Sequence, residues 1–407
     1  MKGWVLLALL IVAGLSVACK EEEKQANLDP YKIGLMGDMT GSGRQNYGPI
    51  VEGIRNYFRN LNAKGGIDGH PVDVGTVEDN RSDPAAAIAA MKKFIEGGAI
   101  LAINPSLSAT YAPTVAEAEK VNFPYILAGV CTPENYPPAP KPFLFCAGWA
   151  GRDSWAAQVQ SIYEQSQGKA KLAILNMDVP IARIQGDYGE KKAKGMGLEV
   201  VSRADVPPGT ADLTSYADKF ISAKADWLLA ASPVDITVAG YEALLRRGWK
   251  GGFILDYIAG CSDAVVERFK QDDLMALCIY SRPADNLPIH KDINAAAKKY
   301  GAATPVVEFG HIQGWINGIM IEQVLRQCGW PCSREKALSV MSNVEFKKES
   351  FQGLLPGPIK WTPQNHAGIR YTRVYHWDSD KKKIVPVTKW WQTEMTPDQD
   401  VKITPID

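Results

Sequence analysis

The sequence has no excess of charge of either sign and few histidines. Its 407 residues carry 45 Lys and Arg against 45 Asp and Glu, so the formal net charge is zero. A nucleic-acid-binding domain is usually basic, and a disordered chain combines high net charge with few apolar residues. With 46% hydrophobic and 22% charged residues, the chain is instead typical of a folded globular protein. At roughly 150 residues per domain, its length predicts two or three domains.

Catalytic and cofactor motifs are also missing. The sequence contains no Gly-x-Ser-x-Gly elbow, no His-Glu-x-x-His pair and no Cys–His signature, and none of its five histidines lies in a recognisable catalytic frame. The glycine-rich GSGRQNYG lacks the Gly-Lys-Ser/Thr end of a phosphate-binding loop. Glu78, Asp79 and Asp83 are an alternative metal site, but helix capping and packing explain these residues better. We therefore expect no enzyme, no cofactor and no metal.

The first residues have the pattern of an export signal. Residues 4–17 are apolar, but this run is shorter than the roughly 20 residues needed to cross a bilayer. The sequence SVAC followed by KEEEKQANLDP resembles a bacterial lipoprotein processing site. It predicts a signal peptide over 1–18, a lipidated Cys19, a tether over 19–29 and a periplasmic or otherwise extracytoplasmic location. Because Ser16 occupies a place where a large aliphatic residue is usual, ordinary cleavage after Ala18 is the alternative.

Six further cysteines permit disulfides in an exported protein, and six cysteines allow fifteen pairings. Cys328 and Cys332 are closest in sequence and form the first candidate pair. Cys131 has three readings: a ligand contact, a buried thiol, or a disulfide partner of Cys146. Six free thiols are the alternative to any pairing.

From residue 31 onward, short β-rich runs alternate with amphipathic helical segments. This alternation predicts an α/β fold with parallel sheets and helices on both faces. The pattern restarts near residues 140–149, so we expect two doubly wound units. Runs at 368–378 and 381–391 predict a final antiparallel hairpin. The expected strands lie in 32–37, 71–79, 99–104, 125–129, 171–176, 197–206, 226–232 and 251–257, and late helices lie in 289–300 and 307–327.

Three segments in order carry a family resemblance: TGSGRQNYG at 40–48, LNAKGGIDGHPV at 61–72 and VEDNRSDP at 77–84. They resemble the type I periplasmic binding proteins of the branched-chain amino acid ABC-transporter group, and the resemblance covers roughly 31–395. It implies two lobes joined by three hinge crossovers, with a small-molecule ligand in the cleft between them. It also implies a permease partner. Together with the charge balance and the first residues, we expect no nucleic acid, membrane contact only through the lipid anchor, and a monomer. We expect residues 30–147 plus 282–355 to form the N-terminal lobe and residues 148–281 plus 356–395 to form the C-terminal lobe. Residues 396–407 are expected to be a C-terminal tail.

Candidate ligand-binding residues follow from this plan. In open α/β sheets, ligands lie beyond the carboxyl ends of strands, where loops lead into helices. The resemblance matches its first-loop aromatic to Tyr47, its third-loop serine to Ser108 and an aromatic of the long helix to Phe309. Ser108 has a helix cap as its alternative role, and the aromatic residues have core packing. The full candidate set is Tyr47, Ser106, Ser108, Thr110, Gly129, Cys131, Trp149, Tyr257, Phe309 and His311.

The groups that hold an amino-acid ammonium in this family are not matched. The expected carboxylate falls at Tyr257, with Asp256 beside it, and the tyrosines of the second lobe fall near Ile181 and Pro233. Burying an ammonium group without a charged or hydrogen-bonding partner costs roughly several kcal/mol of binding free energy, as it does for any unpaired buried charge. We therefore expect an apolar or aromatic carboxylate or amide as the ligand. A ligand sensor coupled to a signalling partner is the alternative function.

Overall fold

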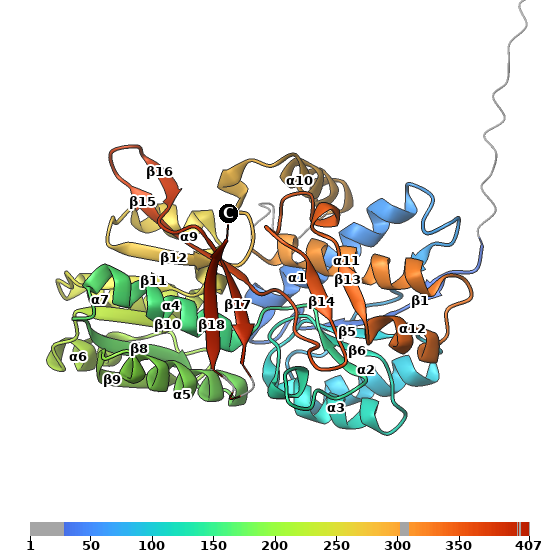
Figure 1. The fold of residues 1–407 in the computed structure, drawn as a ribbon, viewed down its shortest axis with the longest axis horizontal. Helices are drawn as coiled ribbons and strands as arrows, with labels where there is room; N and C mark the ends of the chain where they lie inside the picture. The colour runs from blue at the N-terminus through green and yellow to red at the C-terminus, as the bar shows by residue number, and fades with distance from the viewer. Residues whose placement is uncertain (1–27, 302–308, 397, 399, 407) are drawn as a thin grey trace, which may run out of the picture.

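The computed structural model describes residues 28–301, 309–396, 398 and 400–406. The predicted signal peptide, the lipidated Cys19 and most of the tether lie outside these residues. Figure 1 shows two α/β lobes side by side, each built around its own sheet. Within the described ranges, no helix has both the length and the apolar character needed to cross a bilayer.

The first lobe contains a five-stranded parallel sheet in the order β4-β2-β5-β6-β7. Helices α2 and α3 pack together, and α1 packs with α11. The short strands β1 and β3 form a separate parallel pair. The elements are β1 Tyr31–Lys32, β2 Gly34–Gly37, α1 Arg44–Asn62, β3 Val72–Asp73, β4 Glu78–Asp79, α2 Pro84–Glu96, β5 Ala102–Asn104, η1 Ser108–Thr110, α3 Tyr111–Glu119, β6 Tyr125–Leu127, η2 Pro133–Asn135 and β7 Leu144–Cys146.

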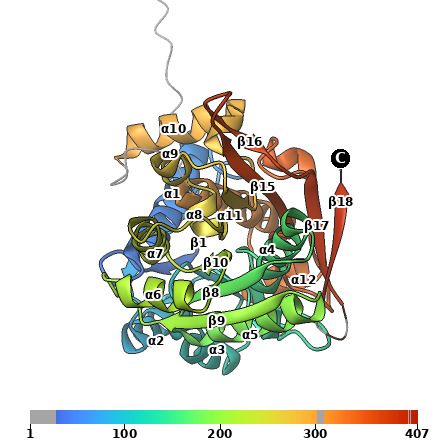
Figure 2. The ribbon, with the colours of Figure 1, turned by 90° about the vertical axis from the view of Figure 1, so that its left-hand side faces the viewer.

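The second lobe contains a nine-stranded mixed sheet, shown from its own side in Figure 2. Strands β8 to β12 are parallel, and β15 to β18 add antiparallel pairs beyond β12. The predicted hairpin is β15 with β16. The elements are α4 Gly151–Ser166, β8 Lys171–Met177, α5 Pro180–Gly195, β9 Glu199–Val206, α6 Thr214–Ser222, β10 Trp227–Ala231, α7 Val234–Arg246, β11 Gly252–Leu255, α8 Tyr257–Gly260, α9 Asp263–Phe269, β12 Leu274–Cys278, β15 Tyr371–Asp378, β16 Lys383–Pro386, β17 Trp390–Met395 and β18 Val401–Ile406.

After β12 the chain returns to the first lobe. The returning elements are η3 Pro283–Asp285, α10 Pro288–Tyr300, α11 Phe309–Cys328, α12 Arg334–Met341, β13 Val344–Phe346, η4 Lys348–Phe351 and β14 Ile359–Trp361. Helix α11 lies directly against α1, and glycines make this close approach possible. A Cβ added at Gly314 would meet the carbonyl oxygen of Ile50 and lie 2.7 Å from the amide nitrogen of Ile54. The two helix backbones therefore touch where Gly314 has no side chain.

Two boundaries differ from the sequence-based division. Strand β14 pairs with β13, and the rings of Trp361 and His366 pack on Phe145, so the first lobe continues to about His366 and does not end at 355. The segment at 396–407, expected as a tail, contributes β18, because its backbone pairs with β17 from Val401 to Ile406. The crossovers between the sheets therefore lie within 147–150, 279–287 and 362–370.

The structure contains three disulfides: Cys131–Cys146, Cys261–Cys278 and Cys328–Cys332. The last is the pair that the short spacing favoured. None of these six cysteines is a free thiol, so Cys131 cannot offer a thiol to a ligand.

The contact between α1 and α11 predicts a strong effect of a single methyl group. Gly314→Ala is expected to lower the free energy of unfolding by about 1–3 kcal/mol, because the added Cβ forces two helix backbones apart. Gly195→Ala is the control, since a Cβ on this exposed helical glycine meets no heavy atom within 4 Å. Urea denaturation measures both variants. Equal stability of Gly314→Ala and the wild type would show that the helices are not in backbone contact.

Candidate functional site

A largely apolar cavity lies between the two lobes, at the carboxyl ends of their strands. It has about 500 Å³ of empty space, counting the part open to solvent. Among the described residues that line it, Asp256 is the only charged one, and no Lys, Arg or His takes part. The lining residues are Tyr47, Leu107, Ser108, Val130, Trp149, Gly151, Ser154, Trp155, Met177, Val179, Ile181, Ala182, Gln185, Ala231, Ser232, Pro233, Asp256, Tyr257 and Ile258.

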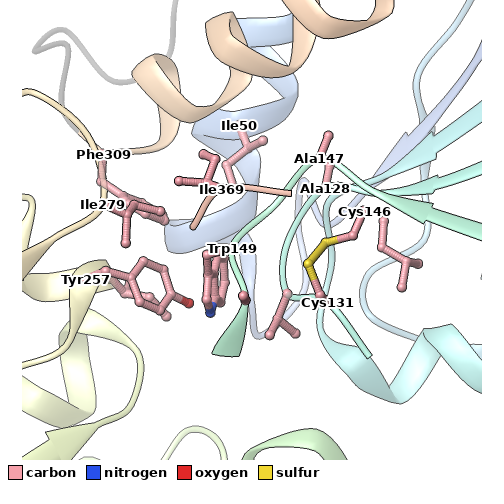
Figure 3. Close-up of a cluster of buried hydrophobic side chains, with 14 of the residues drawn as sticks. Ile50, Ala128, Cys131, Cys146, Ala147, Trp149, Tyr257, Ile279, Phe309 and Ile369 are labelled. Atoms are coloured by element: carbon pink, nitrogen blue, oxygen red, sulfur yellow. A yellow bond between two sulfur atoms is a disulfide. The ribbon is translucent and has the colours of Figure 1, made fainter. Parts of the chain in front are cut away.

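Aromatic rings from both lobes meet in this cavity. Trp149 lies in the first crossover and Tyr257 begins α8, and their ring centroids are 3.7 Å apart (Figure 3). The backbone of Trp149 is held in the first lobe, where its N–H donates to the carbonyl of Gly129 at 3.2 Å. Tyr47, in the first turns of α1, lines the cavity from the first lobe. The two lobes therefore touch through aromatic side chains at the place where a ligand has room.

Gly129 contributes through its backbone, because it has no side chain to offer. A Cβ at this position would lie 2.5 Å from the hydroxyl oxygen of Tyr111 and 3.0 Å from the ring of Tyr47. The missing side chain lets the strand end approach the Tyr47 ring closely. Gly129, a predicted site residue, is therefore not in the lining of the cavity but lies against the Tyr47 ring, which is.

Two buried hydroxyl groups at the cavity lack a hydrogen-bond partner among the described residues: the Tyr257 hydroxyl and the Ser232 hydroxyl. Burial of such groups without a partner costs roughly 1–3 kcal/mol each. Burial also raises the pKa of Tyr257, with Asp256 adding to the effect. Both hydroxyls therefore remain protonated donors at neutral pH and are available to a bound molecule.

Asp256 is the main electrostatic feature of the site. It is 4% exposed, and its carboxylate caps α8 by accepting the Ala259 N–H at 3.4 Å. Burial raises the pKa of this carboxyl well above its usual range. No ion pair of the described residues includes Asp256. Its hydrogen bonds come from the backbone N–H groups of Ala259 and Ile258, and a ligand that donates a further hydrogen bond to Asp256 would stabilise the buried carboxyl more fully.

Ser106 and Thr110 do not line the cavity, contrary to the prediction. The Ser106 hydroxyl donates to the side-chain oxygen of Asn104 at 2.6 Å and lies 2.8 Å from the Thr110 hydroxyl. The Asn104 side chain in turn donates to the Tyr125 hydroxyl at 2.8 Å. The turn directs Ser106 and Thr110 inward, where these side chains satisfy one another. Ser108, between them in sequence, is the one that faces the cavity.

Phe309 and His311 line a neighbouring opening between α1, α7, α9 and the start of α11. This opening has about 1080 Å³ of empty space, including solvent, and shares Ile258 with the main cavity. The His311 ring nitrogen Nε2 lies 3.2 Å from a Glu52 carboxylate oxygen. The Phe309 ring lies 5.6 Å from the Tyr257 ring. These two predicted residues therefore lie beside the main cavity and not in its lining.

Cys131 is likewise displaced from the main cavity. It lines a smaller adjacent cavity with Tyr136 and Arg152, because its sulfur is joined to Cys146. The tryptophan Trp315, which sequence reasoning considered, packs edge-on against Tyr57 at 5.0 Å within the helical layer. Trp155, considered with it, lines the main cavity.

Several lining residues were not among the predicted site residues, notably Asp256, Ser232, Ser154 and Gln185. For Asp256 a signal was present, because it ends the apolar run GGFILDY at the carboxyl end of a strand. Ser232 has the same position after β10. Ser154 and Gln185 lie on α4 and α5, and the sequence pattern alone does not show which faces of these helices meet the cleft.

The acidic residues considered as metal ligands have other partners. Asp79 accepts hydrogen bonds from the Met39 and Arg81 amides and the Thr40 hydroxyl. Asp83 caps α2, and Glu78 pairs with Lys93. No group of three or more His, Cys, Asp or Glu side chains within the described ranges is arranged to hold a metal.

Two α/β lobes with three crossovers and a cavity between them define the class of bilobal solute-binding proteins. The family model described as "Periplasmic binding protein" matches residues 30–382, and the chain belongs to this family.

Individual relatives are distant in sequence. The leucine-specific-binding protein of Salmonella typhimurium is 29% identical over 127 residues, a match that spans 31% of this chain and 34% of that protein. A branched-chain amino acid ABC transporter protein from Thermus thermophilus, solved with valine, superposes with a TM-score of 0.77 at 16% identity, covering 90% of this chain and 97% of that one. A solute-binding protein from R. palustris, solved with 4-hydroxybenzoate, has a TM-score of 0.69 at 14% identity, covering 93% and 96%. At these identities the structures show a shared fold.

The burial of Asp256 predicts how its replacement changes stability. A carboxyl whose folded pKa is raised costs stability once pH exceeds its unfolded value of about 3.9, and costs nothing well below that value. Asp256→Asn is therefore expected to raise the free energy of unfolding of the ligand-free protein at pH 7, and the gain should vanish as the pH falls toward 3.

Asp38→Asn is the matched control, because Asp38 is also buried but accepts the Gly41 and Gly43 N–H groups and the Ser82 hydroxyl. It should lower stability at pH 7. Denaturant unfolding at the two pH values measures both variants. A loss of stability for Asp256→Asn at pH 7 would contradict the assignment of Asp256 as an uncompensated carboxyl.

Proposed function

We propose that this protein is the substrate-binding component of an ABC importer, which captures a small organic solute between its lobes and delivers it to the permease. The observation that carries this proposal is the cavity itself, with Tyr47 on one lobe, Tyr257 on the other and Trp149 at the crossover. A ligand there contacts both lobes at once. Binding energy from both lobes favours the closed arrangement over one in which they separate, and closure is what a transporter recognises.

The lining supports a mostly apolar ligand. Trp149, Trp155, Tyr257 and the aliphatic residues around them offer stacking and apolar surface, which suits an aromatic ring or a branched chain. Ser108, at the start of the turn that leads into α3, offers a hydroxyl for a ligand carboxylate or amide. None of the described lining residues is cationic, so a ligand with more than one negative charge is disfavoured. We therefore infer an apolar or aromatic carboxylate or amide, with a hydrogen-bond donor directed at Asp256.

An α-amino acid is the second candidate, and Asp256 is the observation that favours it. The sequence argument against an ammonium group rested on the absence of a carboxylate, yet Asp256 lines the cavity. The solved relatives are consistent with either class, since one was solved with valine and another with 4-hydroxybenzoate. The charge on the ligand group that meets Asp256 separates the two candidates.

The first experiment identifies small molecules that co-purify with the protein by mass spectrometry. Isothermal titration calorimetry then tests benzoate, 4-hydroxybenzoate, benzamide, L-leucine and L-valine. We expect the aromatic acids or the amide to bind most tightly, and Trp149→Ala and Tyr257→Ala to weaken binding about tenfold or more. Tyr163→Ala, at an exposed tyrosine, is the matched control and should leave affinity unchanged.

Asp256→Asn discriminates the ligand classes. It should leave the affinity for an aromatic acid or amide nearly unchanged, because the asparagine side-chain oxygen still accepts a hydrogen bond from a neutral ligand donor. It should abolish binding of an amino acid, because the ammonium loses its partner. If only leucine or valine binds the wild type, the aromatic-acid proposal is wrong.

We also propose that the mature protein is anchored outside the cytoplasm by lipid on Cys19. Cys19→Ser is then expected to move the protein from the detergent phase to the aqueous phase in Triton X-114 partitioning. If wild type and variant both partition into the aqueous phase, the protein has no lipid anchor at Cys19, and ordinary cleavage after Ala18 is favoured.

A further inference from the structure

Two of the three disulfides occupy equivalent places in the two lobes. In the first lobe, Cys146 is the last residue of β7 and is joined to Cys131, which follows β6. In the second lobe, Cys278 is the last residue of β12 and is joined to Cys261, which follows α8. The sequence separations are 15 and 17. Each disulfide therefore joins a segment beside the cavity to the strand end from which the chain leaves for the other lobe.

The first of these disulfides positions the backbone of Trp149. The N–H of Cys131 donates to the Trp149 carbonyl at 2.9 Å, and Val130, the neighbour of Cys131, forms a β-bridge with Trp149. Cys146 ends β7 directly before this crossover, three residues before Trp149. The Cys131–Cys146 bond thus links the segment that contains Val130 to the strand end that leads to Trp149. Figure 3 shows this disulfide beside Trp149.

The second disulfide positions α8. The N–H of Cys261 donates to the Tyr257 carbonyl at 3.0 Å, and the Gly260 N–H donates to the Asp256 carbonyl at 2.6 Å. The Ile279 N–H, at the start of the second crossover, donates to the sulfur of Cys261 at 3.4 Å. The Cys261–Cys278 bond thus ties the short helix with Asp256 and Tyr257 to the end of β12.

The two residues next to these disulfides, Trp149 and Tyr257, contact each other. Trp149 is held by the first, Tyr257 by the second, and their rings lie 3.7 Å apart across the lobes. All four cysteines are at most 2% exposed, so these are interior bonds beside the cavity and not surface links. The short helix α8 has only four residues, too few to be stable without such support.

We propose that Cys131–Cys146 and Cys261–Cys278 are a matched pair of positioning disulfides, one in each lobe, which hold Trp149 and Tyr257 in place for ligand binding. This inference rests on the proposed function for its effect on affinity. The positioning of the two aromatic residues is a property of the ligand-free protein and is measured separately. A disulfide elsewhere in the same chain has no such role.

Cys328–Cys332 supplies the matched control. It closes the turn after α11, where Trp330 packs against Tyr31 at the β1 side of the first lobe, and neither cysteine lines the cavity. The variants C131S/C146S, C261S/C278S and C328S/C332S each remove one disulfide from the full mature chain. Where a serine pair fails to fold, the corresponding alanine pair replaces it, because alanine adds no polar group to these buried positions.

Hydrogen–deuterium exchange of the ligand-free proteins tests the positioning itself. C131S/C146S is expected to speed amide exchange at least about tenfold in 129–131 and 147–150, and C261S/C278S in 257–261 and 279–281. C328S/C332S should change neither region. We call C131S/C146S and C261S/C278S the cleft variants. Unchanged amide exchange around the cavity in both cleft variants would overturn the proposal.

Calorimetry with benzoate and L-leucine as probes, well below the unfolding temperature of each variant, tests the consequence. Each cleft variant should bind the probe that wild type binds about tenfold more weakly, and C328S/C332S within twofold of wild type. In a Trp149→Ala background, removal of Cys131–Cys146 should cost less than about threefold, since the group it positions is gone. The same tenfold loss in both backgrounds would show a general structural effect and contradict positioning.

The two failures are distinguishable. If wild type binds neither probe, the ligand class of the proposed function is wrong, and the exchange measurement alone decides the positioning. If wild type binds and the cleft variants bind equally well, the positioning proposal is wrong while the proposed function stands.

Discussion

The contact between the rings of Trp149 and Tyr257 is the interaction on which the rest of the site depends. One ring belongs to the first crossover and the other begins α8 of the second lobe, and their centroids are 3.7 Å apart. Neither lobe alone has walls on all sides of the cavity, so its shape exists only while the lobes are together. The strand ends of both lobes and, as proposed above, two disulfides bring these two rings to the same place.

The charge distribution of the cavity underlies the proposed ligand class. Among the described residues, the lining is mostly apolar, with one buried carboxyl and no cation, which favours ligands by their charge more than by their shape. The raised pKa of Asp256 reflects the cost of keeping this charge out of water. The buried hydroxyls of Tyr257 and Ser232 add donors that have no partner among the described residues. Buried polar groups without hydrogen-bond partners lower the free energy of unfolding. A ligand that forms hydrogen bonds with them recovers part of that free energy on binding.

Much of the fold was predictable from sequence, because the alternation of apolar strand runs and amphipathic helices is a local property of the chain. Four residues expected near the cleft from the resemblance or from their segments, Tyr47, Ser108, Trp149 and Tyr257, line the cavity. The third crossover was not predictable, since the assignment of β14 depends on tertiary packing of Trp361 on Phe145.

Side-chain direction was the second limit. Ser106 and Thr110 lie in a hydroxyl-rich loop of the expected kind, yet the turn directs them toward Asn104 and away from the cavity. Asp256 was displaced by one position from the expected carboxylate. At the start of a helix, one residue of shift decides whether a side chain caps the helix or enters the cleft, and Asp256 does both.

The central claim is that a guest molecule completes a site to which both lobes contribute, and small-angle X-ray scattering of the mature protein tests it most directly. With the co-purified ligand or a binding probe added, the account predicts a smaller radius of gyration than for the stripped protein, and Trp149→Ala should reduce this change. Superimposable scattering curves with and without a ligand that calorimetry shows to be bound would contradict the account.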